Sequence, residues 1–167
     1  MSDIGFFDPE ALDIYIALLY EVKGFSSDGM VSIRKEEDSF KASTGSSGVT
    51  ERISLPSNNY LLEFPLAQTS PTNSILTTIL NLDKVTNRAV FPVYIKDRIS
   101  GSLFFSDSCF ITRPPDVEYT GNIETRKWSL YCTNVSFSLS GSETKDMSAG
   151  LSSLVSLASS FNSVIGG

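Results

Sequence analysis

The sequence predicts a mainly β protein of the α+β class, in which an antiparallel sheet curls around one helix. The first observation is a series of short runs of alternating or β-branched apolar residues, separated by turn-forming Gly, Pro, Ser and Asn. The second is one stretch with helical spacing between these runs, from Ser70 to Leu82. A helix that is apolar on one side needs a sheet to lie against, so the two observations predict a single fold.

The length and composition indicate one globular domain. The chain has 167 residues, of which 41% are hydrophobic and 19% charged, values that exclude wholesale disorder. The net charge is −6 and no Lys/Arg cluster stands out, which excludes stable wrapping of nucleic acid through its phosphates. An acidic surface instead suits a polyanion that slides past without sticking. No secretory signal is expected, and the apolar run from Ile14 to Leu19 is too short to span a bilayer.

The first half of the chain is expected to form strands. Leu12 to Val22 alternates apolar and polar residues, which predicts one half-buried strand. Gly45–Gly48 (G-S-S-G) lies between two alternating runs and predicts a long hairpin with a mobile tip. Pro65 indicates an edge position or a strand end, because proline cannot donate to a ladder. The other strands of this half are Met30–Lys35, Ser39–Thr44, Val49–Leu55 and Tyr60–Leu66.

The predicted helix spans about residues 70–83. Ser70 can cap its first turn through the hydroxyl, and Pro71 suits the first helical position, where no N–H is needed. The segment from Asp83 to Arg88 is polar and is expected to be a loop. The apolar face is expected to hold Ile75, Leu76, Ile79, Leu80 and Leu82, with Asn73, Thr77, Thr78 and Asn81 mostly opposite.

The second half returns to strands and ends in a different kind of segment. Strands are expected at Ala89–Lys96, Ser102–Thr112 and Arg126–Phe137. Residues 1–141 are therefore expected to form one β domain, and residues 142–167 a Ser-rich amphipathic helix. That helix could dock on its own domain, clasp a neighbouring subunit or partner, or lie at a membrane, although basic anchors are missing. Its apolar seam is Met147, Leu151, Leu154, Ala158, Phe161 and Ile165.

Catalytic and metal chemistry have little support. The chain has no His, which excludes Ser-His-Asp, Cys-His and His-metal sites, and it has no phosphate-binding glycine motif. The acidic patch Glu36–Asp38 lacks the spacing of a calcium loop, and a solvated or interface position is expected for it. Paired carboxylates for glycoside chemistry remain open, since their pairing is spatial. Cys109 and Cys132 are expected to be buried free thiols, with a disulfide as the alternative.

Several stretches resemble one protein family when they are taken together. They are K-E-E-D-S-F-K-A-S-T-G-S-S-G-V-T-E-R, L-A-Q-T-S-P-T-N-S-I-L, F-P-V-Y-I-K-D-R-I-S-G-S-L-F-F-S-D-S-C-F-I-T-R-P-P-D-V-E-Y and R-K-W-S-L-Y-C. The T-S-P-x-N start of the helix, the P-D-V-x-Y step and the lone Trp128 are the closest matches. In their order and spacing these stretches are similar to tail tube proteins of contractile-tailed bacteriophages, over roughly Val22 to Phe137.

This resemblance implies a β-barrel or sandwich of the tail tube type with a flanking helix, and no enzymatic activity or cofactor. It implies hexameric rings that stack into an inner tail tube through which phage DNA passes without specific binding. The implied partners are copies of the chain itself and tail sheath, baseplate or tape-measure proteins, in a virion assembled in the host cytoplasm. Inter-ring contacts map to Glu36, Glu37, Asp38, Phe40, Ser46 and Ser47, and partner contacts of the C-terminal helix to Leu151, Leu154, Phe161 and Ile165.

Two alternatives accompany this prediction. Residues 1–11 and 142–167 go beyond a compact tube subunit, which favours a tube-like initiator ring near the baseplate as the alternative. A different class is a monomeric carbohydrate- or protein-binding β-sandwich, in which aromatic residues line a groove. The candidate groove residues are Tyr94, Phe104, Tyr119 and Trp128.

Overall fold

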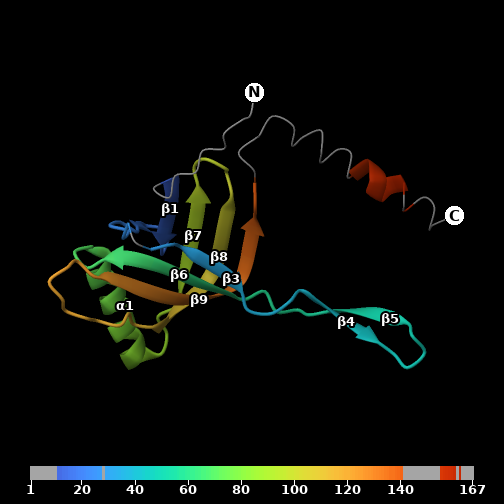
Figure 1. The fold of residues 1–167 in the computed structure, drawn as a ribbon, viewed down its shortest axis with the longest axis horizontal. Coiled ribbons are helices and arrows are strands. Elements are labelled where there is room, and N and C mark those ends of the chain that lie inside the picture. The colour runs from blue at the N-terminus through green and yellow to red at the C-terminus, as the bar shows by residue number, and fades with distance from the viewer. Residues whose placement is uncertain (1–10, 28, 141–154, 161, 163–167) are drawn as a thin grey trace.

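The computed structural model describes residues 11–27, 29–140, 155–160 and 162. Its body is a seven-stranded sheet in the order β2-β1-β7-β8-β9-β6-β3, in which every pair of neighbours is antiparallel (Figure 1). A separate two-stranded sheet, β4-β5, projects from this body. The elements are β1 (Leu12–Ile16), β2 (Tyr20–Glu21), β3 (Ser32–Lys35), β4 (Phe40–Thr44), β5 (Thr50–Ser54), β6 (Tyr60–Ala67), α1 (Thr72–Thr86), β7 (Phe91–Asp97), β8 (Leu103–Arg113) and β9 (Thr125–Ser138).

The mainly β class with one flanking helix is confirmed, but the sheet is not a closed barrel. Its two edges, β2 and β3, are not bonded to each other within the described residues. The chain that leaves β2 runs along β6 instead. Gly24 accepts a hydrogen bond from the Ala67 N–H at 2.9 Å, and the Ser26 N–H donates to the Pro65 carbonyl at 3.1 Å. The result is a curled, open sheet whose gap is bridged by backbone contacts.

Alternation along the strands places the core on one face of the sheet. In β9 the even positions from Trp128 to Cys132 are buried, while Lys127 and its alternate neighbours face outward. The largest fully buried side chains are Trp128, Phe64, Phe104, Ile14, Ile16, Leu62, Leu66, Leu76, Leu130 and Val93. The helix covers part of this face through Leu76, with Ile79 and Leu80 half-buried.

The strand predicted from Leu12 to Val22 is wrong in its length. The chain turns sharply after Ile16, where Ala17 and Leu18 have φ angles of 55° and 60°, and then returns as β2. Alternation survives the turn, because the Val22 N–H bonds back to Ile14 and both side chains are buried. A pattern of apolar residues at every second position cannot distinguish a continuous strand from two strands that share a face.

Pro65 was expected at an edge position or a strand end. β6 is not an edge strand, because it pairs with β9 along its whole length and with β3 along its first half, but Pro65 lies near its end, beyond the residues paired with β3. The carbonyl of Pro65 accepts from Ser26, on the side away from β9. Backbone N–H and C=O groups of one strand residue point the same way, so the missing N–H of Pro65 costs β9 no hydrogen bond.

Helix α1 begins as predicted and ends later. The Ser70 hydroxyl accepts a hydrogen bond from the Thr72 N–H at 3.2 Å, although Pro71 precedes the first helical residue. The segment predicted to be a loop after Leu82 is helical through Thr86, and Asn87 ends the helix in the left-handed conformation, its N–H bonded to Asp83. No helix in the described residues has the length and apolar character needed to cross a membrane.

The C-terminal segment is described only in part. Residues 155–160 and 162 have helical backbone and are exposed, and they fall within the predicted amphipathic helix. The predicted contact residues Leu151, Leu154, Phe161 and Ile165 lie outside the described residues.

Candidate assembly surface

The most distinctive surface is the arm, defined here as residues 36–54, which contains β4, β5 and the turn between them. Every residue of the arm is exposed, and β4 and β5 pair only with each other (Figure 1). At the tip, the Gly48 N–H bonds to the Gly45 carbonyl at 3.0 Å and Gly48 has a φ of +82°, which confirms the predicted turn. An isolated two-stranded hairpin is marginally stable in water. Among the described residues, the arm therefore lacks the partner that such a structure ordinarily needs.

The two faces of the arm differ. On one face Arg52 lies 4.3 Å above the Phe40 ring, and the hydroxyls of Thr44 and Thr50 are 2.9 Å apart. Register places Lys41, Ser43, Glu51 and Ile53 together on the opposite face. Both outer strand edges carry unpaired backbone N–H and C=O groups. The arm thus offers two strand edges and one face without cross-strand side-chain hydrogen bonds.

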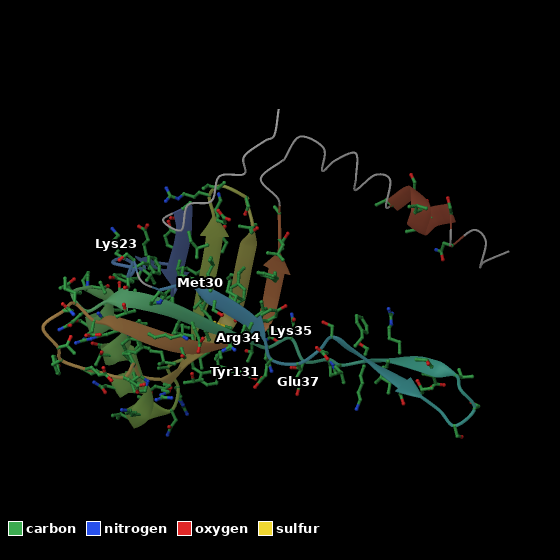
Figure 2. The ribbon with its side chains drawn as sticks, viewed as in Figure 1. Lys23, Met30, Arg34, Lys35, Glu37 and Tyr131 are labelled. Atoms are coloured by element: carbon green, nitrogen blue, oxygen red, sulfur yellow. The ribbon has the colours of Figure 1, made fainter. Side chains whose placement is uncertain are left out.

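The base of the arm is held against the sheet. The Tyr131 hydroxyl in β9 donates a hydrogen bond to the Glu36 carboxylate, and the Glu36 N–H donates to the Asn59 carbonyl at 3.0 Å. The bond to Glu36 is the main reason why the pKa of Tyr131 is raised above its ordinary value. Figure 2 shows Lys35, Glu37 and Tyr131 close to where the arm leaves the body. These contacts fix the direction in which an otherwise unsupported hairpin projects.

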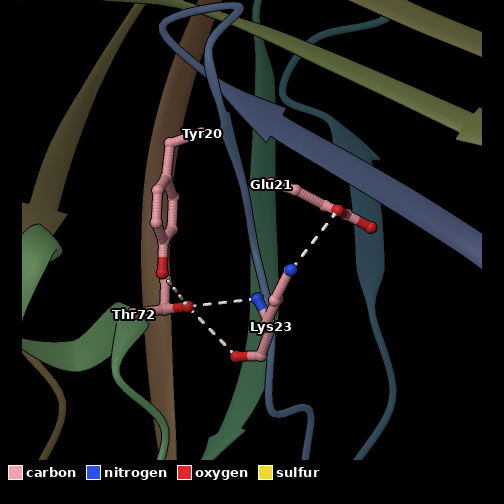
Figure 3. Close-up of polar contacts among 4 residues, drawn as sticks. All are labelled: Tyr20, Glu21, Lys23 and Thr72. Atoms are coloured by element: carbon pink, nitrogen blue, oxygen red, sulfur yellow. Dashed lines mark hydrogen bonds and ion pairs between the residues drawn. The ribbon is translucent and has the colours of Figure 1, made fainter.

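A second polar cluster joins the start of α1 to the segment after β2 (Figure 3). The backbone N–H of Lys23 donates a hydrogen bond to the Thr72 hydroxyl at 3.1 Å. The Thr72 hydroxyl donates in turn to the Lys23 carbonyl at 3.0 Å. The Tyr20 hydroxyl lies 3.2 Å from the Thr72 hydroxyl oxygen, and the Lys23 ammonium pairs with the Glu21 carboxylate at 3.8 Å. This cluster, together with Ser70, anchors the helix to the strand segment that crosses the open side of the sheet.

The side chain of Asn73 connects the helix to the sheet. Its amide donates to the Ala67 carbonyl at 2.9 Å, and its oxygen accepts from the Trp128 indole N–H at 2.9 Å. The prediction that Asn73 lies on the polar outer face is therefore wrong, because the residue is only 6% exposed. A buried indole N–H needs an acceptor, and this asparagine supplies it.

Several large apolar side chains on the body are exposed. They occur at the β1–β2 turn, before β3, at the end of α1, in the loop between β8 and β9 and just after β9. Leu19 is 92% exposed, Val85 84% and Tyr119 81%. Single exposed apolar residues are ordinary, but here they accompany an arm that has no partner. The most exposed members of this set are Leu19, Val85, Met30, Tyr119, Leu139 and Ile123.

A surface pocket of about 460 Å³ lies on the outer side of β3 and β6. At its centre the Glu63 carboxylate pairs with Lys127 at 3.0 Å and with Arg34 at 3.4 Å. Two cations therefore already neutralise this carboxylate, which makes it part of a surface ion-pair network. No group of three or more potential metal ligands occurs among the described residues.

The groove proposed for a carbohydrate-binding module is wrong. Phe104 and Trp128 are 1% and 2% exposed and pack in the core, whereas Tyr119 is exposed in a distant loop. Tyr94 faces outward from β7, where its ring lies 6.2 Å from that of Tyr15. The four aromatic residues therefore do not share a surface.

The structure brings the predicted assembly residues to two ends of one element. Glu36, Glu37 and Asp38 lie at the base of the arm, with Phe40 just beyond them, and all are exposed. Ser46 and Ser47 lie in the turn at the tip. Sequence analysis did not single out Tyr131 or Asn59, which orient the arm. Their partners are close only after β9 and β6 have paired, so no local pattern marks them.

The fold is shared with solved contractile injection systems. Two structures described as tube terminators are similar: the anti-feeding prophage cap (TM-score 0.56, 12% identity, 83% of this chain and 97% of that chain) and the sheath/tube terminator of an extracellular contractile injection system, PVC (0.57, 11%, 82% and 99%). The PVC sheath-tube complex in the extended state is also similar (0.54, 14%, 77% and 88%). The curled sheet with its flanking helix is thus a tail-tube-type fold.

A sequence relative identifies the family. Structural protein ORF10 of Pseudomonas phage KPP10 is 30% identical over 126 residues, which cover 74% of this chain and 73% of that protein. No family model matches the chain. The chain belongs to the family of this phage structural protein and has the tail tube fold, which confirms the resemblance seen in the sequence motifs.

Proposed function

We propose that this protein is a non-enzymatic virion subunit whose copies form hexameric rings, stacked into the inner tube of a phage tail. Its family membership and its fold support this proposal. In this assembly the arm reaches the adjacent ring, and DNA passes through the lumen during ejection. A net charge of −6 favours passage of DNA without binding.

The observation that carries the proposal is the unpartnered arm. Two short strands with both edges open and every residue exposed gain little from folding alone, so a contact outside the subunit would stabilise them. Pairing with a second copy would bury the open edges and the half-exposed Phe40 and Ile53. Tyr131 and Glu36 hold the arm in the direction in which such a contact can form.

Other surfaces fit further partners. The exposed end of α1, with Leu82 and Val85, is available to a neighbouring subunit or to the tail sheath. Residues 142–167 extend beyond the β domain, and we assign them to contacts with a neighbour, a baseplate protein or a tape-measure protein. Assembly takes place in the host cytoplasm under this proposal.

A ring at an end of the tube is a second candidate function. Two of the similar structures are described as terminators, and the chain covers 97% and 99% of them, compared with 88% of the chain from the sheath-tube complex. An end ring must bind different partners on its two sides. A tube-like initiator at the baseplate and a cap at the far end both meet this requirement.

The test is electron microscopy of the purified chain, with a mass measurement in solution. Stacked rings or open-ended tubes support a bulk tube subunit, whereas single rings that do not stack support an end ring. A chain that remains monomeric at high concentration overturns both proposals. Replacing residues 40–54 with a short Gly-Ser turn should abolish stacking while circular dichroism of the body is retained.

Point variants locate the contact more finely. Glu37→Lys combined with Asp38→Lys should impair stacking, because it reverses charge at the base of the arm. Asp116→Lys combined with Glu118→Lys is the matched control, since it also reverses two charges at exposed residues, outside the arm. Equal stacking of both variants would show that the arm base is not an interface.

Deletion of residues 142–167 tests the role of the C-terminal segment. Unchanged ring formation and partner binding after the deletion would exclude an intersubunit role for this segment.

A further inference from the structure

The two cysteines lie opposite each other at the centre of the sheet. Cys109 in β8 is the register partner of Cys132 in β9, and both side chains point into the core with no exposed surface. Their sulfur atoms are 2.7 Å apart and form a thiol–thiol hydrogen bond, and both cysteines are free. The strands that carry them are the longest in the part of the chain that the structure describes, with 11 and 14 residues.

We propose that Cys109 and Cys132 are an oxidation site that converts to an intrachain disulfide when the protein meets a small-molecule disulfide such as oxidised glutathione. Directly opposite residues of antiparallel strands have Cα atoms about 4.5–5.5 Å apart, which is within the range that disulfides require. The register therefore brings the sulfurs together without any movement of the backbone between strands. This proposal is independent of ring or tube assembly.

The chemistry balances as two exchange steps. The Cys109 thiolate attacks one sulfur of the glutathione disulfide, forming a mixed disulfide and releasing one glutathione thiolate. The Cys132 thiolate then attacks the Cys109 sulfur, forming the intrachain bond and releasing the second glutathione thiolate. The protein loses two protons and two electrons, and the glutathione disulfide is reduced to two thiols.

The surroundings favour Cys109 as the first nucleophile. The contact with the Cys132 thiol lowers the pKa of the Cys109 thiol, and Ser106 adds to this effect, although burial opposes it. The same pairing raises the pKa of Cys132. Cys109 is thus the thiol that ionises more readily.

Irregular backbone beside the pair gives the oxidant a route to the buried sulfurs. The register between β7 and β8 shifts just before Cys109, between the pairs Phe91–Cys109 and Val93–Ser106. On the other strand Asn134, two residues from Cys132, has a φ of 50°. Ladders open most readily where their hydrogen bonding is interrupted. Oxidation is therefore expected in the folded chain, at a rate limited by local opening.

The test uses the full chain, purified under reducing conditions and then incubated with oxidised glutathione. The intact mass should fall by two hydrogen atoms, and a non-reducing peptide map should join the two cysteine peptides. The melting temperature should rise by roughly 10 °C, because the bond closes a loop across 23 positions. Reduction with a dithiol should reverse all three changes.

The variants Cys109→Ser and Cys132→Ser serve as matched controls. Each should retain one thiol, form no intrachain link and show no rise in melting temperature on oxidation. Two outcomes overturn the proposal: wild-type protein that keeps both thiols while folded, and a link that forms only between chains or only with loss of the native circular dichroism spectrum. If a variant does not fold, the intact mass and the peptide map of the wild-type protein decide whether the intrachain disulfide forms.

Discussion

Replacing Asn73 with Ala should destabilise the protein strongly, although the residue lies in the first turn of a mostly exposed helix. The side chain makes two hydrogen bonds of 2.9 Å, and its loss leaves the Trp128 indole N–H buried without an acceptor. The loss of two hydrogen bonds, with one buried donor left without an acceptor, should lower the free energy of unfolding by about 2–4 kcal/mol. In a chain of this size, the melting temperature should fall by roughly 5–15 °C.

Urea unfolding measures this change, followed by fluorescence of the single Trp. The matched control is Asn81→Ala, which makes the same change at an exposed position of the same helix and should alter stability by less than about 0.5 kcal/mol. In a Trp128→Phe background, which lacks the donor and whose unfolding is followed by circular dichroism, Asn73→Ala should cost less than in the wild type. An Asn73→Ala variant as stable as its control would refute the argument.

Three further predictions concern the backbone and two titrating groups. Gly24→Ala should destabilise the fold by about 1–3 kcal/mol, because φ is +75° and an added Cβ would lie 2.8 Å from the Cβ of Ser70. Glu36→Gln should lower the pKa of Tyr131 toward its ordinary value, as followed by NMR, because the hydrogen bond to Glu36 is what raises it most. Ser100→Ala should raise the pKa of Asp97, which the Ser100 hydroxyl holds below its ordinary value of 3.8. Because the folded pKa of Asp97 is depressed, its stabilising effect is present above pH 3.8 and is lost as pH falls through the lower folded value.

Each of these predictions has a control or a contradicting outcome. Gly121→Ala should be nearly neutral, since an added Cβ meets open space there. A Tyr131 titration that does not move in Glu36→Gln would mean that the hydrogen bond does not persist in solution. Equal Asp97 midpoints with and without the Ser100 hydroxyl would assign the low pKa to the backbone N–H groups alone.

Local patterns predicted the strands and the helix start, because each depends on residues close in sequence. Ser70 accepts from the N–H two residues later, and the G-S-S-G turn bonds within itself. The failures involve partners far apart in the chain. Asn73 was assigned to the solvent face because periodicity counts it as polar, whereas its partner Trp128 lies 55 positions away.

The same limit applies to the assembly surface. Alternation in Phe40–Thr44 and Thr50–Ser54 predicted a hairpin, but it could not show that neither face of that hairpin rests on the body. Alternating strands normally bury one side, and here all ten strand residues are exposed. Exposure is a property of the whole fold, so the sequence could indicate the arm but not its isolation.

The open edges of β4 and β5 also bear on how free copies behave. An unpaired edge can template the addition of any extended strand, so a pool of such subunits is at risk of uncontrolled association. Lys41, Glu51 and Arg52 place charges of both signs along these short strands, which disfavours haphazard pairing. If the arms join copies as proposed, the contact that builds the assembly also covers the strand edges that would otherwise template uncontrolled association.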